Sequence, residues 1–436
     1  MPGFRHIFKR LIYFPISPAI FRATVSLMRT VRFLRLLPLG ESPAIKRVFV
    51  SYPYSRVGDL VLLLPLLETI QQNWPESVVD VAVGAGVADL LLGVNGLGRV
   101  FLFNPSQAKL RIFDRYSRIV RAVLFYRKQI MENDYDLAIV PRWGSVETYD
   151  SIYLAYLTGA PQRCGYSASV DGGDTEVDAL LTKVATGGSL EPEALRNVRL
   201  LTRTGLMRRG LGETDFVNQP IQSLVNLSHM GHRFEPSVSD RFPRPEEKYA
   251  VISPGATKAF CIWPMEHMVE FAREFSREVR WPLYVVGNVV DASLCEELER
   301  QVPGYAISLG GKTTLPQLVG LLSNAQFFLG NDSGTAHLAG ALGIPTVVVH
   351  PFPLSCQEEH PNSPSRFRPC GPLVQVVQPE RTLAPCYPTC GETGAHCIRQ
   401  IQVSQVLDAS VSLLRGSPGF SPGRGIPTGD LRSEQV

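Results

Sequence analysis

The feature that most constrains the fold is a regular alternation of short apolar strands with helical segments. RVFVSY (47–52) is followed by the helical pattern LVLLLPLLETIQQNW (60–74), and VVDVAVGA (78–85) begins the next unit of the alternation. The alternation restarts at YAVISPGA (249–256), after a polar, proline-containing stretch over 216–246 that has no clear period. Strands that alternate with helices favour parallel, doubly wound sheets. We therefore predict an α/β protein built from two similar wound halves.

The length and composition of the chain agree with two domains. Its 436 residues exceed what one hydrophobic core usually organises, and 44% hydrophobic with 19% charged residues is ordinary for a globular protein. The end of the chain is poor in apolar residues, so we predict that it is disordered. The predicted division is a basic amphipathic extension at 1–46, an N-terminal Rossmann-like domain at 47–235, a C-terminal one at 236–415 and a tail at 416–436.

Basic residues gather at the start of the chain, although the formal net charge of +3 is too small to indicate a nucleic-acid partner. Arginines recur there near helical spacing, with apolar residues between them, at Arg22, Arg29, Arg32 and Arg35. Such a helix either lies in an anionic membrane surface or docks on the protein's own body. No apolar run reaches the roughly 18 residues that a membrane span needs, and prolines interrupt any signal peptide. We expect a cytoplasmic protein and leave peripheral contact with the membrane open.

The stretch GNDSGTAH places small polar residues where an apolar strand ends and a helix begins. The free amides and partial positive charge of a helix start suit a diphosphate, and Gly334 lacks a side chain that would hold phosphate oxygens away. Asp332 and Ser333 either cap the helix or orient a ligand, and His337 either faces the ligand or packs beneath the loop. His350 ends the next strand at the same edge of the sheet, and we do not favour it as a ligand.

A second loop of this kind, SPGATKAFCIWPMEH, follows the first strand of the C-terminal half. Thr257 and Lys258 offer a hydroxyl and a cation, which suit phosphate oxygens. The run GGKT at 310–313 is similar to the end of a P-loop, but that pattern requires a glycine where Ala306 stands. We therefore exclude a P-loop ATPase.

In the N-terminal half, the loop PYSRVGD follows the first strand. Asp59 opens the next helix, at the carboxyl end of that strand, and Arg56 would add a cation nearby. An aspartate at such a place is either an N-cap or a general base that faces a bound substrate. The local sequence leaves both interpretations open.

Three longer segments occur in a fixed order and at fitting intervals: SRVGDLVLLLPLLETIQQNWP, SPGATKAFCIWPMEHMVEFA and GGKTTLPQLVGLLSNAQFFLGNDSGTAHLAGALGIPTVVV. Together they resemble the bacterial ADP-heptose:lipopolysaccharide heptosyltransferases, glycosyltransferase family nine. The resemblance covers roughly residues 47 to 412, and its most specific motif is GNDSG followed by histidine.

The resemblance implies a GT-B fold, in which two facing Rossmann-like domains enclose a cleft. It implies that the C-terminal domain binds the nucleotide-sugar donor and the N-terminal domain a lipid-linked or other saccharide acceptor. It also implies inverting transfer from an ADP-sugar, with no cofactor and no obligatory metal. Matched residue by residue, Asp59 is the general base. The donor-binding positions are Thr257, Lys258, Asp291 (for a ribose hydroxyl), Asp332, Ser333, Gly334 and His337.

One position departs from the family. Cys261 stands two residues before the Trp-Pro pair, where the family has a phosphate-binding lysine. Either Lys258 reaches the same phosphate from a rearranged loop, or the contact is lost at a cost of about 1.5–3 kcal/mol. The departure keeps open a different donor sugar and a non-catalytic, nucleotide-sugar-binding relative. A sugar-nucleotide epimerase or hydrolase of the same fold is a further alternative, but no second acid or base accompanies Asp59.

Four of the eight cysteines lie close together near the end of the chain, at Cys370, Cys386, Cys390 and Cys397. The spacing C-x15-C-x3-C-x6-C would suit a four-thiolate zinc or iron site, and His396 would join or replace a ligand. The gaps contain no tight CxxC pair, so we favour free thiols and predict no metal.

Overall fold

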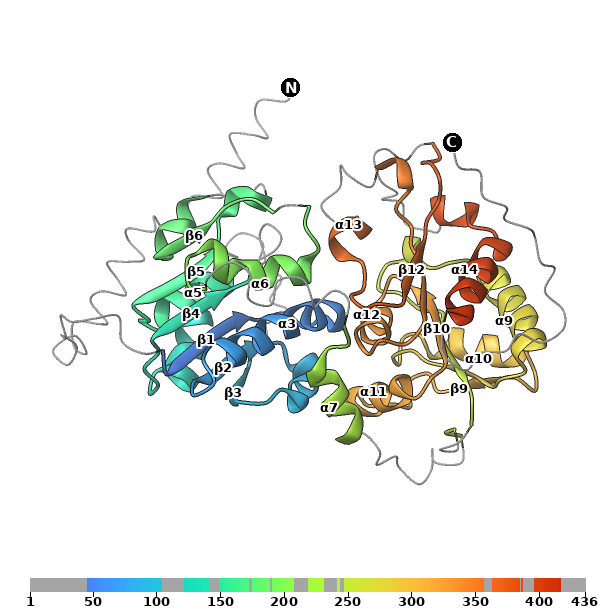
Figure 1. Ribbon diagram of the computed structural model, residues 1–436, viewed down its shortest axis with the longest axis horizontal. Coiled ribbons are helices and arrows are strands. Elements are labelled where there is room, and N and C mark those ends of the chain that lie inside the picture. The colour runs from blue at the N-terminus through green and yellow to red at the C-terminus, as the bar shows by residue number, and fades with distance from the viewer. Residues whose placement is uncertain are drawn as a thin grey trace. The chain divides into compact units, whose positions relative to one another are not determined.

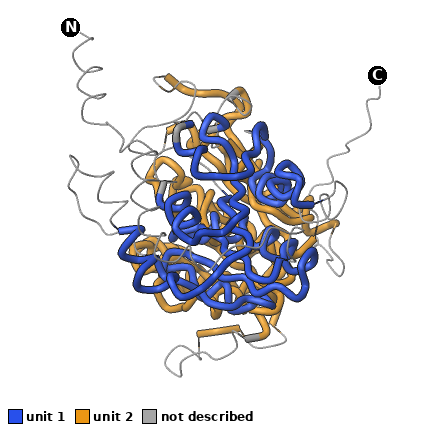
Figure 2. Tube along the Cα trace, turned by 90° about the vertical axis from the view of Figure 1, so that its left-hand side faces the viewer, with its two compact units in different colours: residues 1–216 blue, residues 217–436 orange. Residues whose placement is uncertain are grey.

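The computed structural model divides the chain into two compact units, residues 1–216 and 217–436, which Figure 2 shows in different colours. Each unit is described by itself. The described residues are 45–103, 121–141, 149–171, 175–188, 190–207, 219–230, 241–243, 247–356, 363–384, 386 and 396–416. The predicted basic extension, apart from its last two residues, and the predicted tail, apart from its first, lie outside them.

The first unit contains one six-stranded parallel sheet in the order β3-β2-β1-β4-β5-β6 (Figure 1). Its strands are β1 (Arg47–Tyr52), β2 (Val78–Val83), β3 (Leu97–Leu102), β4 (Leu137–Val140), β5 (Gln162–Tyr166) and β6 (Lys183–Ala185). Its helical segments are α3 (Val57–Asn73), η1 (Ala85–Gly93), η2 (Tyr126–Ile130), α5 (Tyr149–Leu157), η3 (Ala168–Asp171), η4 (Thr175–Leu180) and α6 (Glu193–Arg203). The central strands are buried on both faces, which is why they read as continuous apolar runs.

Helix α3 begins at Val57, three residues before the helical pattern predicted at 60–74. Pro65 therefore lies well inside the helix. A proline there has no N–H for the preceding turn and disturbs that turn's hydrogen bonds. Asn197, which is fully buried in α6, donates its side-chain N–H to the carbonyl oxygen of Leu62 at 3.0 Å. Helix α6 packs along α3, and its Asn197 side chain supplies a hydrogen bond to a backbone carbonyl in the turn that precedes Pro65.

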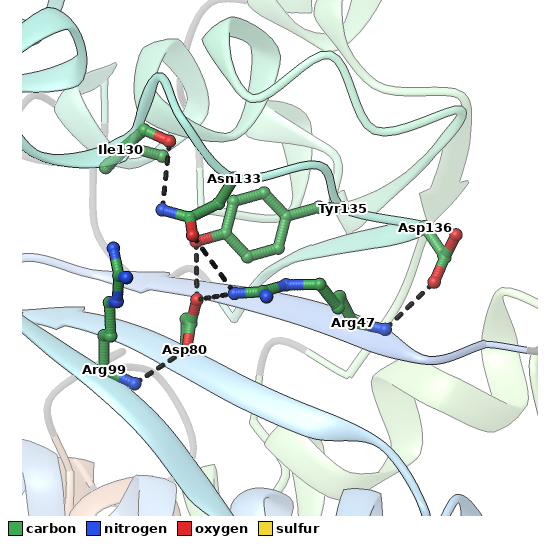
Figure 3. Close-up of polar contacts among 7 residues, drawn as sticks. All are labelled: Arg47, Asp80, Arg99, Ile130, Asn133, Tyr135 and Asp136. Atoms are coloured by element: carbon green, nitrogen blue, oxygen red, sulfur yellow. Dashed lines mark hydrogen bonds and ion pairs between the residues drawn. The ribbon is translucent and has the colours of Figure 1, made fainter. Parts of the chain in front are cut away.

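A buried polar network lies at the amino ends of the strands of the first unit (Figure 3). Asp80 of β2 is fully buried and accepts three hydrogen bonds, from the Arg47 guanidinium (2.9 Å), the Tyr135 hydroxyl (2.7 Å) and the Arg99 amide (2.7 Å). Asp136, just before β4, accepts from the amide of Arg47 at 2.9 Å. Burial, and next its hydrogen bond to Asp80, raise the pKa of Tyr135, so its hydroxyl stays a donor. Asp80 is thereby satisfied by three donors from its own unit, and the network stabilises the sheet.

The second unit repeats the strand order of the first, as β12-β11-β10-β7-β8-β9, with every pair parallel. Its strands are β7 (Ala250–Ser253), β8 (Leu283–Val285), β9 (Ala306–Ser308), β10 (Phe327–Asn331), β11 (Thr346–Val349) and β12 (Val374–Val377). Its helical segments are α7 (Gln222–Met230), η6 (Ala259–Cys261), α9 (Met265–Val279), α10 (Ala292–Gln301), α11 (Leu315–Ser323), α12 (Gly334–Ala341), η7 (Leu354–Cys356), α13 (Pro364–Phe367), η8 (Cys397–Gln400) and α14 (Val403–Arg415).

One core cluster joins the sheet of the second unit to α9, α10 and α14. Alternate strand residues contribute to it, as the two-residue period of a strand requires; Phe327 and Leu329 of β10 are examples. Phe275 of α9 stacks on Phe327 with ring centroids 4.9 Å apart. Helices α11 and α12 lie on the other side of the sheet (Figure 1). Both faces are therefore covered, as parallel sheets require.

The structure corrects three details of the sequence-based prediction. The polar stretch 216–246, which showed no clear period in the sequence, contains α7, which packs against α11. Because α7 belongs to the second unit, the division falls at 216/217 and not at the predicted 235. Two short edge strands, β6 and β12, occur where the sequence showed no strand pattern. These short strands form because a neighbouring strand offers a paired edge.

No helix within the described residues is long and apolar enough to cross a membrane.

Candidate functional site

The strand order fixes where each unit can bind a ligand. In both sheets the order reverses next to the first strand, between β1 and β4 in the first unit and between β7 and β10 in the second. At such a switch point the loops at the carboxyl ends of the two strands part to opposite faces and leave a crevice for a ligand. Asp59 follows β1, the pair Thr257 and Lys258 follows β7, and Asp332 follows β10. All of the predicted site residues of these loops therefore lie at switch points.

A buried asparagine ties the two loops of the second unit together. Asn331, the last residue of β10, is fully buried. Its side-chain oxygen accepts from the amide of Trp263 at 3.0 Å, and its side-chain N–H donates to the carbonyl of Pro254 at 2.7 Å. Trp263 is itself buried, and its indole N–H donates to the carbonyl of Ile401 at 3.1 Å. The loop between β7 and α9 is thus held at both of its ends.

The start of α12 offers uncapped donors. Ser333 is the N-cap, but its side chain makes no capping hydrogen bond, and its buried hydroxyl oxygen has no hydrogen-bond partner among the described residues. Amide groups in the first turn of a helix have no partner within the helix and carry a partial positive charge. The structure therefore leaves the amides that begin at Gly334 without a side-chain cap, which suits an anionic ligand.

His337 lies in the first turn of α12 and is only 6% exposed. Its Nδ1 atom is buried and has no hydrogen-bond partner among the described residues. Burial lowers the pKa of His337 below its ordinary value, although the nearby charge of Asp332 acts in the opposite direction. A neutral imidazole with one unpartnered buried nitrogen can exchange a hydrogen bond with a ligand without adding charge.

Asp332 pairs with His350 and does not cap α12. The Asp332 carboxylate lies 3.4 Å from Nε2 of His350, which is buried at the end of β11. Nδ1 of His350 accepts from the amide of Phe352 at 3.2 Å, so its proton is carried on Nε2, toward Asp332. Burial opposes ionisation of Asp332, but His350, His337 and Lys258 outweigh it, and its pKa lies below the ordinary value. The site thus holds an ionised carboxylate.

Thr257 and Lys258 are exposed on the loop after β7. The ammonium of Lys258 lies 5.4 Å from the ring centroid of Phe260, and its charge contributes to the low pKa of Asp332. Cys261 is only 6% exposed and ends the short helix η6. The cation of this loop is therefore Lys258, three residues before Cys261, where the resemblance predicts a lysine.

Asp291 lies close to two glycines, Gly255 on the loop after β7 and Gly287 just after β8. A Cβ atom built on Gly255 would come within 2.3 Å of the Asp291 carboxylate, and one built on Gly287 within 2.7 Å of Asp291 Cβ. The carboxylate accepts from the amide of Asn288 at 3.3 Å. Burial raises the pKa of Asp291 against this hydrogen bond. The absence of a side chain at Gly255 lets this carboxylate approach the candidate diphosphate loop.

In the first unit, Asp59 is not an N-cap. Helix α3 begins at Val57 with Arg56 as its N-cap, so Asp59 is the third helical residue, and its side chain is partly exposed. The hydroxyl of Tyr52 donates to the backbone carbonyl of Asp59 at 3.3 Å. The capping interpretation is therefore wrong, and the role of general base remains a prediction.

The four-cysteine site is also corrected. The structure brings together Cys386, His396 and Cys397, whereas Cys370 is buried elsewhere, with its carbonyl against Gly340 of α12. Cys390 lies outside the described residues.

Sequence reasoning missed two contributors to the site of the second unit. Asn331 was not singled out, and its one sequence cue is a polar amide at the end of the apolar run QFFLGN. His350 was considered and not favoured, although it is the partner of Asp332. Its contact depends on the pairing of β11 with β10, which local sequence does not reveal.

The family model of glycosyltransferase family 9 (heptosyltransferase) matches residues 123–388. Lipopolysaccharide heptosyltransferase 2 of Escherichia coli (strain K12) is 23% identical over 332 residues, which cover 74% of this chain and 86% of that protein. A glycosyltransferase of family 9 from Veillonella parvula DSM 2008 has a similar crystal structure, with a TM-score of 0.66 at 17% identity over 85% of this chain and 98% of that one.

The solved structure of the E. coli heptosyltransferase WaaC with ADP gives a TM-score of 0.59 at 16% identity and covers 84% of this chain and 99% of that one. These likenesses confirm the predicted fold class, an α/β chain of two Rossmann-like units as in GT-B enzymes.

Proposed function

The chain belongs to glycosyltransferase family 9, and on that premise we propose that it moves a heptose, or a closely related sugar, from an ADP-sugar to a saccharide acceptor such as lipopolysaccharide core. That it is a glycosyltransferase follows from the family; the donor, the acceptor and the residue roles belong to the proposal. The relatives it matches are lipopolysaccharide heptosyltransferases, and one similar structure contains ADP.

The observation that carries the proposal is the polar cluster at the switch point of the second unit. The uncapped start of α12 offers amide donors to a diphosphate, and the buried Nδ1 of His337 offers a further contact. Lys258 is exposed on the adjoining loop and supplies a cation. Thr257 and Ser333 supply hydroxyl groups, and Asp291 approaches the same loop, where we assign it to a ribose hydroxyl.

The proposed reaction is a single inverting displacement. Asp59 takes the proton of an acceptor hydroxyl, whose oxygen forms a bond to the anomeric carbon as the bond from that carbon to the diphosphate oxygen breaks. The electron pair leaves with ADP. Negative charge grows on the diphosphate, where the α12 amides and Lys258 stabilise it. Because these groups supply positive charge, we propose that the transfer needs no metal ion at the diphosphate.

We place the enzyme at the cytoplasmic face of the membrane, where a lipid-linked acceptor would be reached. This part of the proposal rests on the acceptors named for the relatives and on the basic, amphipathic sequence of residues 1–46.

The test begins with calorimetric titration of the full chain with ADP, UDP and GDP. We expect selective binding of ADP, weakened about tenfold or more in Asp332→Ala and unchanged in Asp408→Ala, which alters an exposed aspartate on α14. Transfer is then measured with ADP-heptose and a truncated lipopolysaccharide. Asp59→Asn should retain ADP binding and lose about 10²–10⁴-fold in turnover. Asp89→Asn, an exposed site in η1 of the same unit, is the matched control.

Other outcomes would identify the alternatives. Release of sugar into water without an acceptor would indicate a hydrolase, and recovery of an altered ADP-sugar an epimerase. ADP binding with no turnover in wild type would indicate a nucleotide-binding relative. Absence of nucleotide binding would overturn the donor site itself.

A further inference from the structure

Two thiols and one imidazole meet in the second unit, on segments that carry none of the residues proposed to bind the donor. Cys386 follows β12, His396 precedes η8, and Cys397 is the first residue of η8. Cys397 is fully buried, Cys386 is 8% exposed, and His396 is partly exposed. Nδ1 of His396 lies 3.3 Å from Sγ of Cys386 and 3.5 Å from Sγ of Cys397.

These distances match a metal site. Around a tetrahedral zinc ion with Zn–S near 2.3 Å and Zn–N near 2.0–2.1 Å, a sulfur and a nitrogen ligand lie about 3.6 Å apart. The two observed S···N distances agree with that value, and all three ligand atoms lie within 4.8 Å of one another. Thiolate and imidazole ligands select zinc or iron over magnesium and calcium, which prefer oxygen.

We propose that Cys386, His396 and Cys397 bind one divalent transition-metal ion, Zn²⁺ or Fe²⁺. Each thiol loses its proton as its sulfur bonds to the metal, and neutral His396 binds through Nδ1. No change of oxidation state is involved. The sequence-based expectation of free thiols without metal is replaced by this proposal.

The position of the cluster gives the metal a structural role. It joins the segment after β12 to η8, which leads into α14. Other contacts join the same two segments: the amide of Leu383 lies 3.4 Å from Sγ of Cys397, and Gln400 donates to the carbonyl of Arg381 at 2.7 Å. A metal ion would add a cross-link to these contacts and fix the four-residue turn η8 to the segment after β12.

The cross-link reaches the proposed donor loop through a single residue. Ile401 directly follows η8, and its carbonyl accepts the indole N–H of Trp263. The amide of Trp263 is in turn held by Asn331. The metal thus positions Trp263 and acts on the loop between β7 and α9 without contacting a substrate. The metal site itself does not depend on the proposed transfer reaction.

The first test is metal content. The full chain is purified without an immobilised-metal column from cells grown with zinc and iron, and its metals are measured by mass spectrometry. We expect about one zinc or iron per chain in wild type and less than about a tenth of that in Cys397→Ser and Cys386→Ser. Cys370→Ser is the matched control, since Cys370 is a buried thiol of the same unit outside the cluster. It should retain the metal.

The second test needs no variant. Removal of metal from wild type with a chelator should lower the thermal midpoint and increase hydrogen exchange of the peptide 259–264, with no change in the peptide 78–83 of the first unit. Adding zinc back should reverse both effects. Wild type that carries neither zinc nor iron and ignores the chelator would overturn the proposal. An intact mass two daltons low, which would show a Cys386–Cys397 disulfide, would overturn it as well.

Discussion

The two units share one strand order, yet one buried polar cluster of the first unit and one of the second lie at opposite ends of their sheets. In the first unit, Asp80, Arg47 and Tyr135 form their network at the amino ends of the strands (Figure 3). In the second unit, Asn331 and the groups around α12 lie at the carboxyl ends. The same topology therefore carries one polar cluster that stabilises the sheet and another that we propose binds the donor.

The difference lies in which groups each cluster leaves without a hydrogen-bond partner among the described residues. In the first cluster such an atom is Nε of Arg47, whose side chain is 38% exposed. Asp80 accepts three hydrogen bonds from neighbours in its own unit. At the carboxyl ends, in contrast, Nδ1 of His337 and the hydroxyl of Ser333 are buried without a partner among the described residues. Buried polar groups in folded proteins nearly always find a partner, so those that lack one mark the place where a ligand or water belongs.

The largest expected effect is on the stability of the first unit. Asp80→Ala should lower the free energy of unfolding by about 3 kcal/mol, because the Tyr135 hydroxyl and the Arg99 amide lose a buried acceptor. The share of Arg47 is small because its side chain is 38% exposed. Urea denaturation measures the loss, and ADP affinity should stay within about twofold. Asp89→Ala is the exposed control, and an equal loss there would contradict the argument.

The second prediction tests the polar cluster of the second unit. Asn331→Ala should cost about 2–3 kcal/mol and also weaken ADP binding at least about tenfold, because the Trp263 amide and the Pro254 carbonyl lose their partner and the loop loosens. Denaturation and calorimetry on the same preparation measure both. Asn324→Ala, at the exposed C-cap of α11, should leave ADP affinity unchanged. Unchanged affinity in Asn331→Ala would mean that the tie serves stability alone.

A matched pair of glycines sharpens the comparison. A Cβ on Gly84 would lie 2.7 Å from the backbone oxygen of Tyr54, whereas a Cβ on Gly255 would meet the side chain of Asp291. Backbone yields less readily than a carboxylate, so Gly84→Ala should cost about 1–3 kcal/mol and Gly255→Ala less than about 1 kcal/mol. Only Gly255→Ala should weaken ADP binding, by displacing Asp291. The reverse order of stabilities would show that the loop after β7 is the stiffer one.

The smallest expected effect concerns pH. Residues 7–216 contain no histidine, so dependence on pH between 5 and 7 should come mainly from the second unit. Burial lowers the pKa of His337 in the folded state, whereas an unfolded histidine has a pKa near 6.5. The unfolded chain therefore binds a proton first as pH falls, and stability should decline below about pH 6.5. Denaturation midpoints at several pH values should show this slope in wild type and a flatter one in His337→Gln. Equal slopes would place the titration elsewhere.

The fold was largely predictable because its central elements carry strong local patterns. The predicted strand at 47–52 matches β1, and the helical pattern predicted at 60–74 corresponds to most of α3. The short edge strands were missed because their stability comes from pairing. Lys183–Ala185 and Val374–Val377 lie at sheet edges and have only a few residues each.

The candidate site was predictable in its loops and not in its contacts. The residues GNDSG predicted that a helix begins directly after a strand, and α12 begins there in the structure. The partners of Asn331 are 68 and 77 residues away in sequence, and His350 meets Asp332 only because β11 pairs with β10. Contacts of this kind depend on tertiary packing, which no local window contains. The sequence correctly grouped Cys386, His396 and Cys397, but it wrongly included Cys370 in the same cluster.

In each unit, one buried hydrogen bond joins two residues that are separated by more than half of that unit's sequence. Asn197 reaches back 135 residues to Leu62, and the indole of Trp263 reaches forward 138 residues to Ile401. During synthesis on the ribosome, α3 is therefore made long before α6, which carries its partner Asn197. Likewise, the loop after β7 is made long before Ile401, the partner of Trp263. Each unit must remain unfinished until nearly all of it has been synthesised, which exposes its apolar strands to chaperones and to aggregation for most of that time.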